Sequence, residues 1–179
     1  MPYGVKLWEE EAKRVVAALD AHNTEELAWL AGILDGEACF FIDKMFMQSH
    51  AWRGIGYRCV IRTAMTHRET IARIAEMTGQ KVHEVKPARP GYKPQFVVTI
   101  QHSKRIIPVL KRIMPYLVTR REDAMLLLEA SFAEEQKDAS AIQQFRDKIM
   151  AQHSPRGVKP NAPRTAASDS PHRLSTTTT

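Results

Sequence analysis

The stretch from Leu27 to Glu37 constrains the fold more than any other part of this chain. It is almost entirely apolar or small, and it follows Asn23 and Thr24, two residue types that commonly begin helices. We therefore expect a helix over about residues 24–37. Because it is apolar around most of its circumference, this helix should be buried on more than one side.

One side of this helix carries almost no side-chain volume. Ala28, Gly32 and Gly36 recur at every fourth position, which places them along one face of a helix. A glycine inside a helix costs about 1 kcal/mol relative to alanine. Two glycines on one face therefore indicate that another backbone approaches closely. The alternative is a buried helix that merely contains small residues.

The helix also ends on two acids, Asp35 and Glu37. The negative end of the helix dipole lies there and disfavours carboxylates. Acids kept at this end indicate a compensating positive partner, and we interpret that partner as a bound cation.

The segment Leu30–Ala38, with sequence LAGILDGEA, resembles in register the motif of the LAGLIDADG homing endonucleases, with Ala38 where that family usually has its last glycine. The resemblance implies that two such helices pack together at a twofold or pseudo-twofold axis. It also implies that Glu37 binds the catalytic divalent metal, which we expect to be Mg²⁺, and that Asp35 is mainly structural. The chain has one copy of the motif, so we expect a homodimer. The expected dimer interface includes Ala28, Gly32 and Gly36.

The order of the other elements extends this resemblance over about residues 24–135. An amphipathic helix over residues 5–20 precedes the motif helix. Alternating hydrophobicity and turn residues predict strands over residues 39–47, 54–65, 81–85 and 95–101. Later helices are predicted to be capped by Thr66 and Ser103, and a further helix covers residues 119–136. We therefore expect an α+β fold with a LAGLIDADG homing endonuclease-like αββαββα core, in which a four-stranded antiparallel sheet has helices on one face.

We divide the chain into an N-terminal helical extension (1–22), an endonuclease-like domain (23–150) and a tail (151–179). The tail is rich in Ser, Thr and Pro and has little that a core would bury, so we expect it to be disordered. No apolar run approaches the ~20 residues that span a membrane. We therefore expect no membrane partner and a soluble, intracellular protein of unspecified location.

Beyond Glu37, the resemblance assigns two basic residues to the active site. Arg120 matches the basic residue that the family has near the scissile phosphate, where it would stabilise charge in the transition state. Arg68 matches a second such position. An ordinary surface arginine is the alternative reading of each. The position where the family often has an active-site glutamine falls on Ala64, so one group that positions water would be absent.

The net charge of +6 favours a polyanionic partner, because neutralised phosphates release their counterions. We expect duplex DNA on the open face of the sheet, since a two-stranded ribbon fits the major groove. Arg58 and Arg62 share one face of their strand, whereas Phe41, Asp43 and Met45 on the neighbouring strand are poor phosphate partners. A solvated basic face is the alternative reading. The remaining candidate contacts lie at loop ends: Arg53, Lys86, Arg89 and Lys93.

Together these observations predict a site-specific, metal-dependent DNA endonuclease that makes a double-strand break as a homodimer. One alternative is a non-cleaving binder with the same fold, either an RNA maturase acting on intron RNA or a DNA-binding regulator. The acid at Glu37 favours the enzyme. Another alternative is an α+β interaction domain with an accidental motif, which has no need to dimerise.

Overall fold

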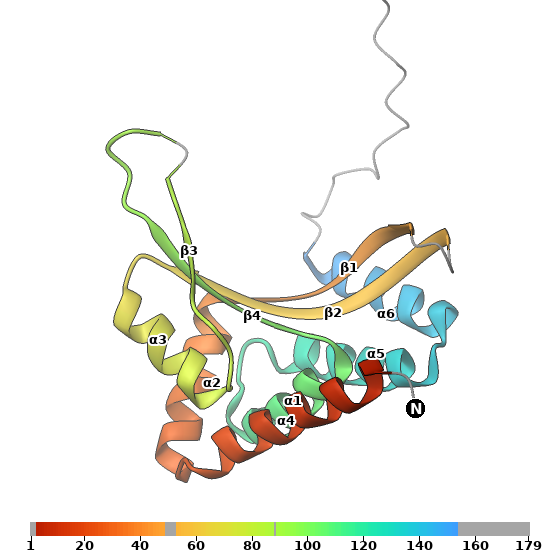
Figure 1. Cartoon of the computed structure of the whole chain (residues 1–179), viewed down its shortest axis with the longest axis horizontal. Coiled ribbons are helices and arrows are strands. Elements are labelled where there is room, and N and C mark those ends of the chain that lie inside the picture. The colour runs from red at the N-terminus through yellow and green to blue at the C-terminus, as the bar shows by residue number, and fades with distance from the viewer. Residues whose placement is uncertain (1–2, 49–52, 88, 154–179) are drawn as a thin grey trace, which may run out of the picture.

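A computed structural model of the chain describes residues 3–48, 53–87 and 89–153 (Figure 1). The four strands form one antiparallel sheet in the order β1-β2-β4-β3. The predicted α+β class and its four-stranded antiparallel sheet are confirmed. In chain order the elements are α1 (Tyr3–Asp20), α2 (Thr24–Glu37), β1 (Ala38–Gln48), β2 (Arg53–Met65), α3 (Arg68–Met77), β3 (His83–Val85), β4 (Gln95–Gln101), α4 (Ser103–Ile113), the 3-10 helix η1 (Met114–Tyr116), α5 (Arg121–Gln136) and α6 (Ala139–His153).

The sheet has two chemically different faces, because successive side chains along a strand point in opposite directions. The inner face is apolar, and the helices lie on this side, below the sheet in Figure 1. Its buried residues include Phe40, Ile42, Ile61, Val98 and Ile100. We call the opposite side the outer face. From the strand register, it carries Cys39, Phe41, Asp43 and Met45 of β1, Arg58, Val60, Arg62 and Ala64 of β2, and Val97, Thr99 and Gln101 of β4.

Helix α2 begins and ends where the sequence predicted. Asn23 and Glu26 form a reciprocal capping box, in which the Asn23 side chain accepts the Glu26 N–H at 3.0 Å. Leu30, Ala31 and Leu34 are fully buried in the core. The inner side of α2 is thus fixed by packing within the chain.

Helix α1 packs against α4 on the side away from the sheet (Figure 1). Val15 and Leu19 of α1 are fully buried. Ion pairs join Glu11 to Arg105 and Asp20 to Arg112, so α1 is tied to α4 along its length. Among the described residues, none of the helices combines the length and apolarity needed to cross a bilayer.

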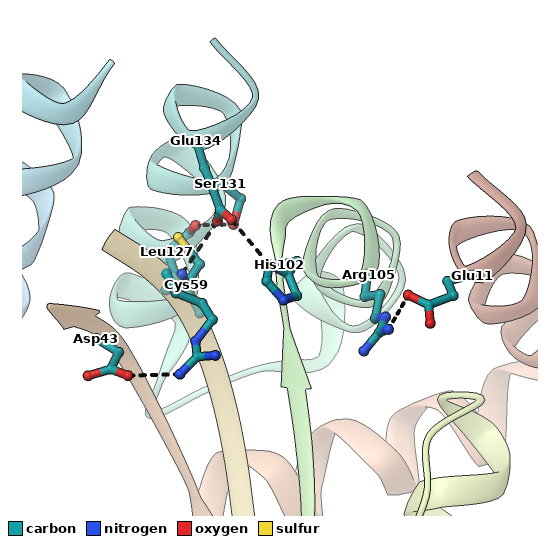
Figure 2. A network of polar contacts seen from close by, with 9 residues as sticks. Glu11, Asp43, Cys59, His102, Arg105, Leu127, Ser131 and Glu134 are labelled. Carbon is teal, nitrogen blue, oxygen red and sulfur yellow. Dashed lines mark hydrogen bonds and ion pairs between the residues drawn. The ribbon is translucent and has the colours of Figure 1, made fainter. Parts of the chain in front are cut away.

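A polar cluster joins α5 to β2 and to the start of α4 (Figure 2). The backbone N–H of Cys59 donates to the Glu134 carboxylate at 3.4 Å, and the other carboxylate oxygen lies 3.7 Å from Nδ1 of His102. Burial of the Cys59 thiol and the negative charge of Glu134 raise the pKa of that thiol to about 12, although a hydrogen bond with Ser131 opposes this. The thiol therefore stays neutral at ordinary pH. The cluster therefore adds polar contacts to the apolar packing of α5, in which Ala124, Leu127 and Ala130 are fully buried.

Two predicted helix caps are wrong. The ring of His67, not the hydroxyl of Thr66, accepts the Thr70 N–H at the start of α3, at 3.3 Å. Ser103 is the first residue of α4 rather than its cap. Residue His102 occupies the cap position with a φ of 73° and makes no capping bond through its side chain.

Helix α6 was not predicted at all. Its buried residues, Ile142 and Ile149, form a narrow stripe in an otherwise mixed sequence, which gives a weak periodic signal. The helix packs on α5 and reaches the inner face of the sheet, where Tyr57 donates a hydrogen bond to the Gln143 side chain. It includes residues 151–153, which the division of the sequence placed in the tail. Residues 154–179 of that tail lie outside the described residues.

Candidate active site and nucleic-acid face

The two acids at the end of α2 have different surroundings. Asp35 accepts the backbone N–H groups of Thr119 at 2.8 Å and of Arg120 at 2.6 Å. Because α5 begins at Arg121, Asp35 caps the positive N-terminus of α5. Burial alone would raise the pKa of Asp35, but these hydrogen bonds outweigh it and hold the pKa below its ordinary value. The positive partner expected for this acid is therefore a helix N-terminus rather than a cation.

Glu37 has no such compensation. The residue is exposed, and within the described part of the chain its carboxylate has no hydrogen bond or ion pair. It is the last residue of α2, directly before β1. Of the two acids, Glu37 is therefore the one available to a ligand from outside the chain.

Glu37 opens into a groove of about 710 Å³. The groove also contains Arg120 and Arg62, so the structure brings together two residues predicted for catalysis and one predicted for DNA binding. Its lining residues are Glu37, Cys39, Phe40, Phe41, Arg62, Ala64, Arg120, Ile149, Met150 and His153.

The structure also places the two other positions that the family resemblance assigned to the active site, Ala64 and Arg68. Ala64 lines the groove, and its methyl side chain offers no polar atom there. Arg68 is not among the lining residues; it is the first residue of α3, and its guanidinium lies 5.9 Å from the centre of the Phe96 ring. The structure therefore does not place Arg68 beside Glu37, and its catalytic role stays a prediction.

A histidine that sequence reasoning missed also belongs to this groove. Nε2 of His153 lies 2.9 Å from Oδ2 of Asp123, and the same oxygen accepts from Nη1 of Arg120 at 3.3 Å. The acid at the third position after Arg120 is a visible helical pair in the sequence. His153 is far away along the chain and gave no signal, because the helix that carries it was not predicted.

On the outer face, Arg58 and Asp43 form an ion pair at 3.0 Å. The register of β1 and β2 sets these residues opposite each other, which explains the acid among the expected DNA contacts. Figure 2 shows Asp43 on β1, the strand next to β2. Arg62 lies on the same face and is exposed. Arg53 is the first residue of β2, and its side chain lies outside the described residues.

The β3–β4 hairpin carries a second basic region. Figure 1 shows that it projects beyond the helices. Lys86, Arg89 and Lys93 are exposed there and line a cavity of about 500 Å³ together with Tyr92. Three of the four predicted loop-end contacts are therefore gathered at one end of the sheet.

The exposed face of α2 is open. Gly32 and Gly36 are both exposed, and a Cβ atom added at either position would meet nothing within 4 Å. Packing within one chain therefore does not require glycine at these positions. Ala28, on the same face, is half-buried.

The described residues of one chain do not assemble a complete metal site. Within residues 3–48, 53–87 and 89–153, no group of three or more His, Cys, Asp or Glu side chains is arranged to hold one. Mg²⁺ is commonly held by one or two carboxylates together with phosphate oxygens and waters. The free carboxylate of Glu37 fits that donor set if the remaining ligands come from outside the chain.

No family model and no curated protein matches the sequence. Solved structures do match the fold. The homing endonuclease I-CvuI, solved with the I-CreI target and Mg without cleavage of the DNA, shares 20% identity and a TM-score of 0.58, over 76% of this chain and 89% of that one. The archaeal intron-encoded homing endonuclease I-Vdi141I, complexed with DNA, shares 13% identity and a TM-score of 0.59, over 76% and 88% of the two chains.

A third match covers less of the solved chain. The LAGLIDADG homing endonuclease I-LtrWI, bound to target DNA, has 15% identity and a TM-score of 0.54 over 74% of this chain, but this chain covers only 46% of it. At these identities the likeness establishes the fold. The chain therefore has the LAGLIDADG homing endonuclease fold, as the motif in Leu30–Ala38 predicted.

Proposed function

We propose that this chain is a homodimeric, site-specific DNA endonuclease that makes a metal-dependent double-strand break. The observation that carries the proposal is the surroundings of Glu37. Its carboxylate is exposed, has no partner among the described residues, and shares a groove with Arg62 and Arg120. Two cations and one free acid suit a phosphodiester, whose negative charge increases in the transition state.

The open face of α2 supports the homodimer. The chain retains glycine at positions 32 and 36 although a side chain would fit there within the monomer. A helix interior disfavours glycine by about 1 kcal/mol per residue, so this choice needs a cause outside the chain. A second copy of α2, packed closely across a twofold axis, provides that cause and brings two Glu37 carboxylates near each other.

The residues of each chain then have distinct roles. The outer face and the hairpin hold the duplex, Arg120 neutralises charge on the scissile phosphate, and Glu37 helps to hold a divalent cation. That cation would supply positive charge at the reacting phosphate. Each protomer would act on one strand.

Ala64 favours a second candidate function, a non-cleaving binder of DNA or intron RNA with this fold. It lines the groove beside Glu37 without a polar side-chain atom. The groove therefore has one fewer group to position an attacking water than the family resemblance implies.

The test compares the unmodified chain with Glu37→Gln on a library of duplex DNA. Ca²⁺ is used to select bound sequences and Mg²⁺ to score cleavage of the same sequences. We expect the unmodified chain to cut, and Glu37→Gln to bind with similar affinity but cut at least about 100-fold more slowly, since charge stabilisation by a metal contributes several kcal/mol.

Glu76→Gln is the matched control, because Glu76 is an exposed helical glutamate outside the groove. It should cut normally. Normal cutting by Glu37→Gln would overturn the assigned mechanism. Specific binding without cutting by the unmodified chain would support the non-cleaving binder instead.

A further inference from the structure

We propose that His153 is a positioning residue that fixes the guanidinium of Arg120 beside Glu37, acting through Asp123. The inference rests on the proposed nuclease function for its catalytic consequence, but its structural content can be tested without cleavage. It gives α6 a role in the active site in addition to its packing.

The contacts form a short chain of hydrogen bonds that ends in the groove. His153 Nε2 and Arg120 Nη1 approach the same oxygen, Oδ2 of Asp123, at 2.9 Å and 3.3 Å. The backbone N–H of Arg120 is held separately by Asp35 at 2.6 Å. Arg120 is therefore restrained at both ends, by Asp35 at its backbone and by Asp123 at its side chain.

Burial makes Asp123 dependent on both partners. Its side chain is 7% exposed, whereas those of Arg120 and His153 are 32% and 44% exposed. A buried carboxylate is strongly destabilised unless hydrogen bonds or opposite charges compensate it. Without His153, the carboxylate of Asp123 is less constrained and gives Arg120 a less defined partner.

Helix α6 is held in place by contacts other than the one between His153 and Asp123. Ile142 and Ile149 of α6 are buried in the core, and Gln143 accepts a hydrogen bond from Tyr57 on the inner face. These contacts anchor α6 independently of Asp123. Substitution of Gln143 therefore weakens the attachment of α6 without touching the groove, whereas substitution of His153 disturbs Asp123.

The experiment compares His153→Leu, His153→Gln and Gln143→Leu with the unmodified chain. Leucine removes the N–H donor, glutamine keeps one, and Gln143→Leu is the matched control for loosening α6. We expect His153→Leu to slow single-turnover cleavage about 10-fold, a loss typical when a residue that orients a group in an active site is removed. DNA affinity in Ca²⁺ should be unchanged, and His153→Gln should restore most of the rate.

A second readout measures Arg120 directly, whether or not the protein cleaves DNA. NMR relaxation of the Arg120 side-chain Nε should report an ordered group in the unmodified chain, His153→Gln and Gln143→Leu, and a mobile one in His153→Leu. Equal order in all four proteins would overturn the inference, as would equal slowing by Gln143→Leu. If the unmodified chain does not cleave DNA, the proposed function fails, while loss of Arg120 order in His153→Leu still supports the positioning role.

Discussion

Helix α2 and the outer face of the sheet use their residues in opposite ways. The two sides of α2 are sharply different. Leu30 and Leu34 are fully buried on one side, and Gly32 and Gly36 face open space on the other. On the outer face, charged and apolar residues alternate with no comparable constraint, and Arg58 is partly neutralised by Asp43.

This difference matches the roles that we propose for the two regions, assembly for α2 and DNA recognition for the outer face. In the proposed dimer both sides of α2 pack closely, and a helix packed in this way tolerates few residue types, so its sequence becomes a recognisable motif. A solvated face that binds a duplex can change its contacts one by one, because individual base contacts contribute independently. We therefore expect a single substitution on α2 to abolish assembly or folding. Substitutions on the sheet should each lower DNA affinity by a small and independent amount.

The largest expected effect comes from closing the open side of α2. Gly32→Leu should give a folded monomer, because a Cβ at this position meets nothing within the chain and leucine favours a helix more than glycine does. Sedimentation should show loss of the dimer, and thermal unfolding should show retained structure. Double-strand cleavage should disappear, because neither protomer would have a partner to cut the second strand.

Glu129→Leu is the control for this experiment, since it places the same side chain at an exposed position of α5. It should remain a dimer and cut DNA. A Gly32→Leu protein that sediments as a dimer would remove the main argument for the α2 interface. Helix α2 would then not differ from the outer face in its sensitivity to substitution.

The same contrast explains what the sequence could and could not predict. Residues 24–37 were assigned correctly to a helix because two signals agree. Asn23 and Thr24 are residue types that begin helices, and a strongly apolar stretch follows them. Helix α6 was missed because its core contacts rest on only a few apolar residues in a polar background. The caps of α3 and α4 were wrong because Ser, Thr and His compete for these positions, and backbone geometry decides among them.

The candidate site was predictable only in part. Glu37 and Arg120 were identified through the family resemblance, and the structure places both in one groove. The contacts of Asp35 with Thr119 and Arg120, and that of Asp123 with His153, could not be predicted, because they join segments that are distant in the sequence and depend on the placement of α5 and α6. Local spacing carries no information about such contacts.

The next effect concerns the outer face. Removal of an arginine that reads a base should cost about 1–3 kcal/mol and relax specificity at one position. Arg62→Ala should weaken binding more than Arg58→Ala, because Arg58 must also give up its ion pair with Asp43 to reach DNA. Fluorescence anisotropy with selected and scrambled duplexes would measure both variants.

The hairpin provides the comparison within the sheet. Lys86→Ala/Lys93→Ala should weaken selected and scrambled DNA alike and reduce the salt slope by about 2, or about one per phosphate contact. If the two arginine variants also weaken both duplexes equally, the outer face binds the backbone only. Sequence reading would then have to be assigned elsewhere.

The smallest expected effect tests whether Asp35 is structural. Asp35→Asn keeps the shape but removes the charge and replaces one of the two carboxylate oxygens, which accept the N–H groups of Thr119 and Arg120, with an NH2 group. Hydrogen bonds to a charged group contribute about 1.5–3 kcal/mol each when buried. Because this site is only partly buried, we expect the free energy of unfolding to fall by about 1–2 kcal/mol in urea titrations at pH 7.

The pH dependence of that loss distinguishes the cap from a general packing defect. The pKa of Asp35 is lowered in the folded chain, so the folded state holds fewer protons than the unfolded state near the ordinary value of 3.8. The stabilisation is therefore complete above pH 3.8 and is lost as the pH falls through the lower folded pKa. The stability difference between the unmodified chain and Asp35→Asn should shrink over this range. A difference that stays constant below pH 3.8 would mean that the charge of Asp35 does not contribute to the loss of stability.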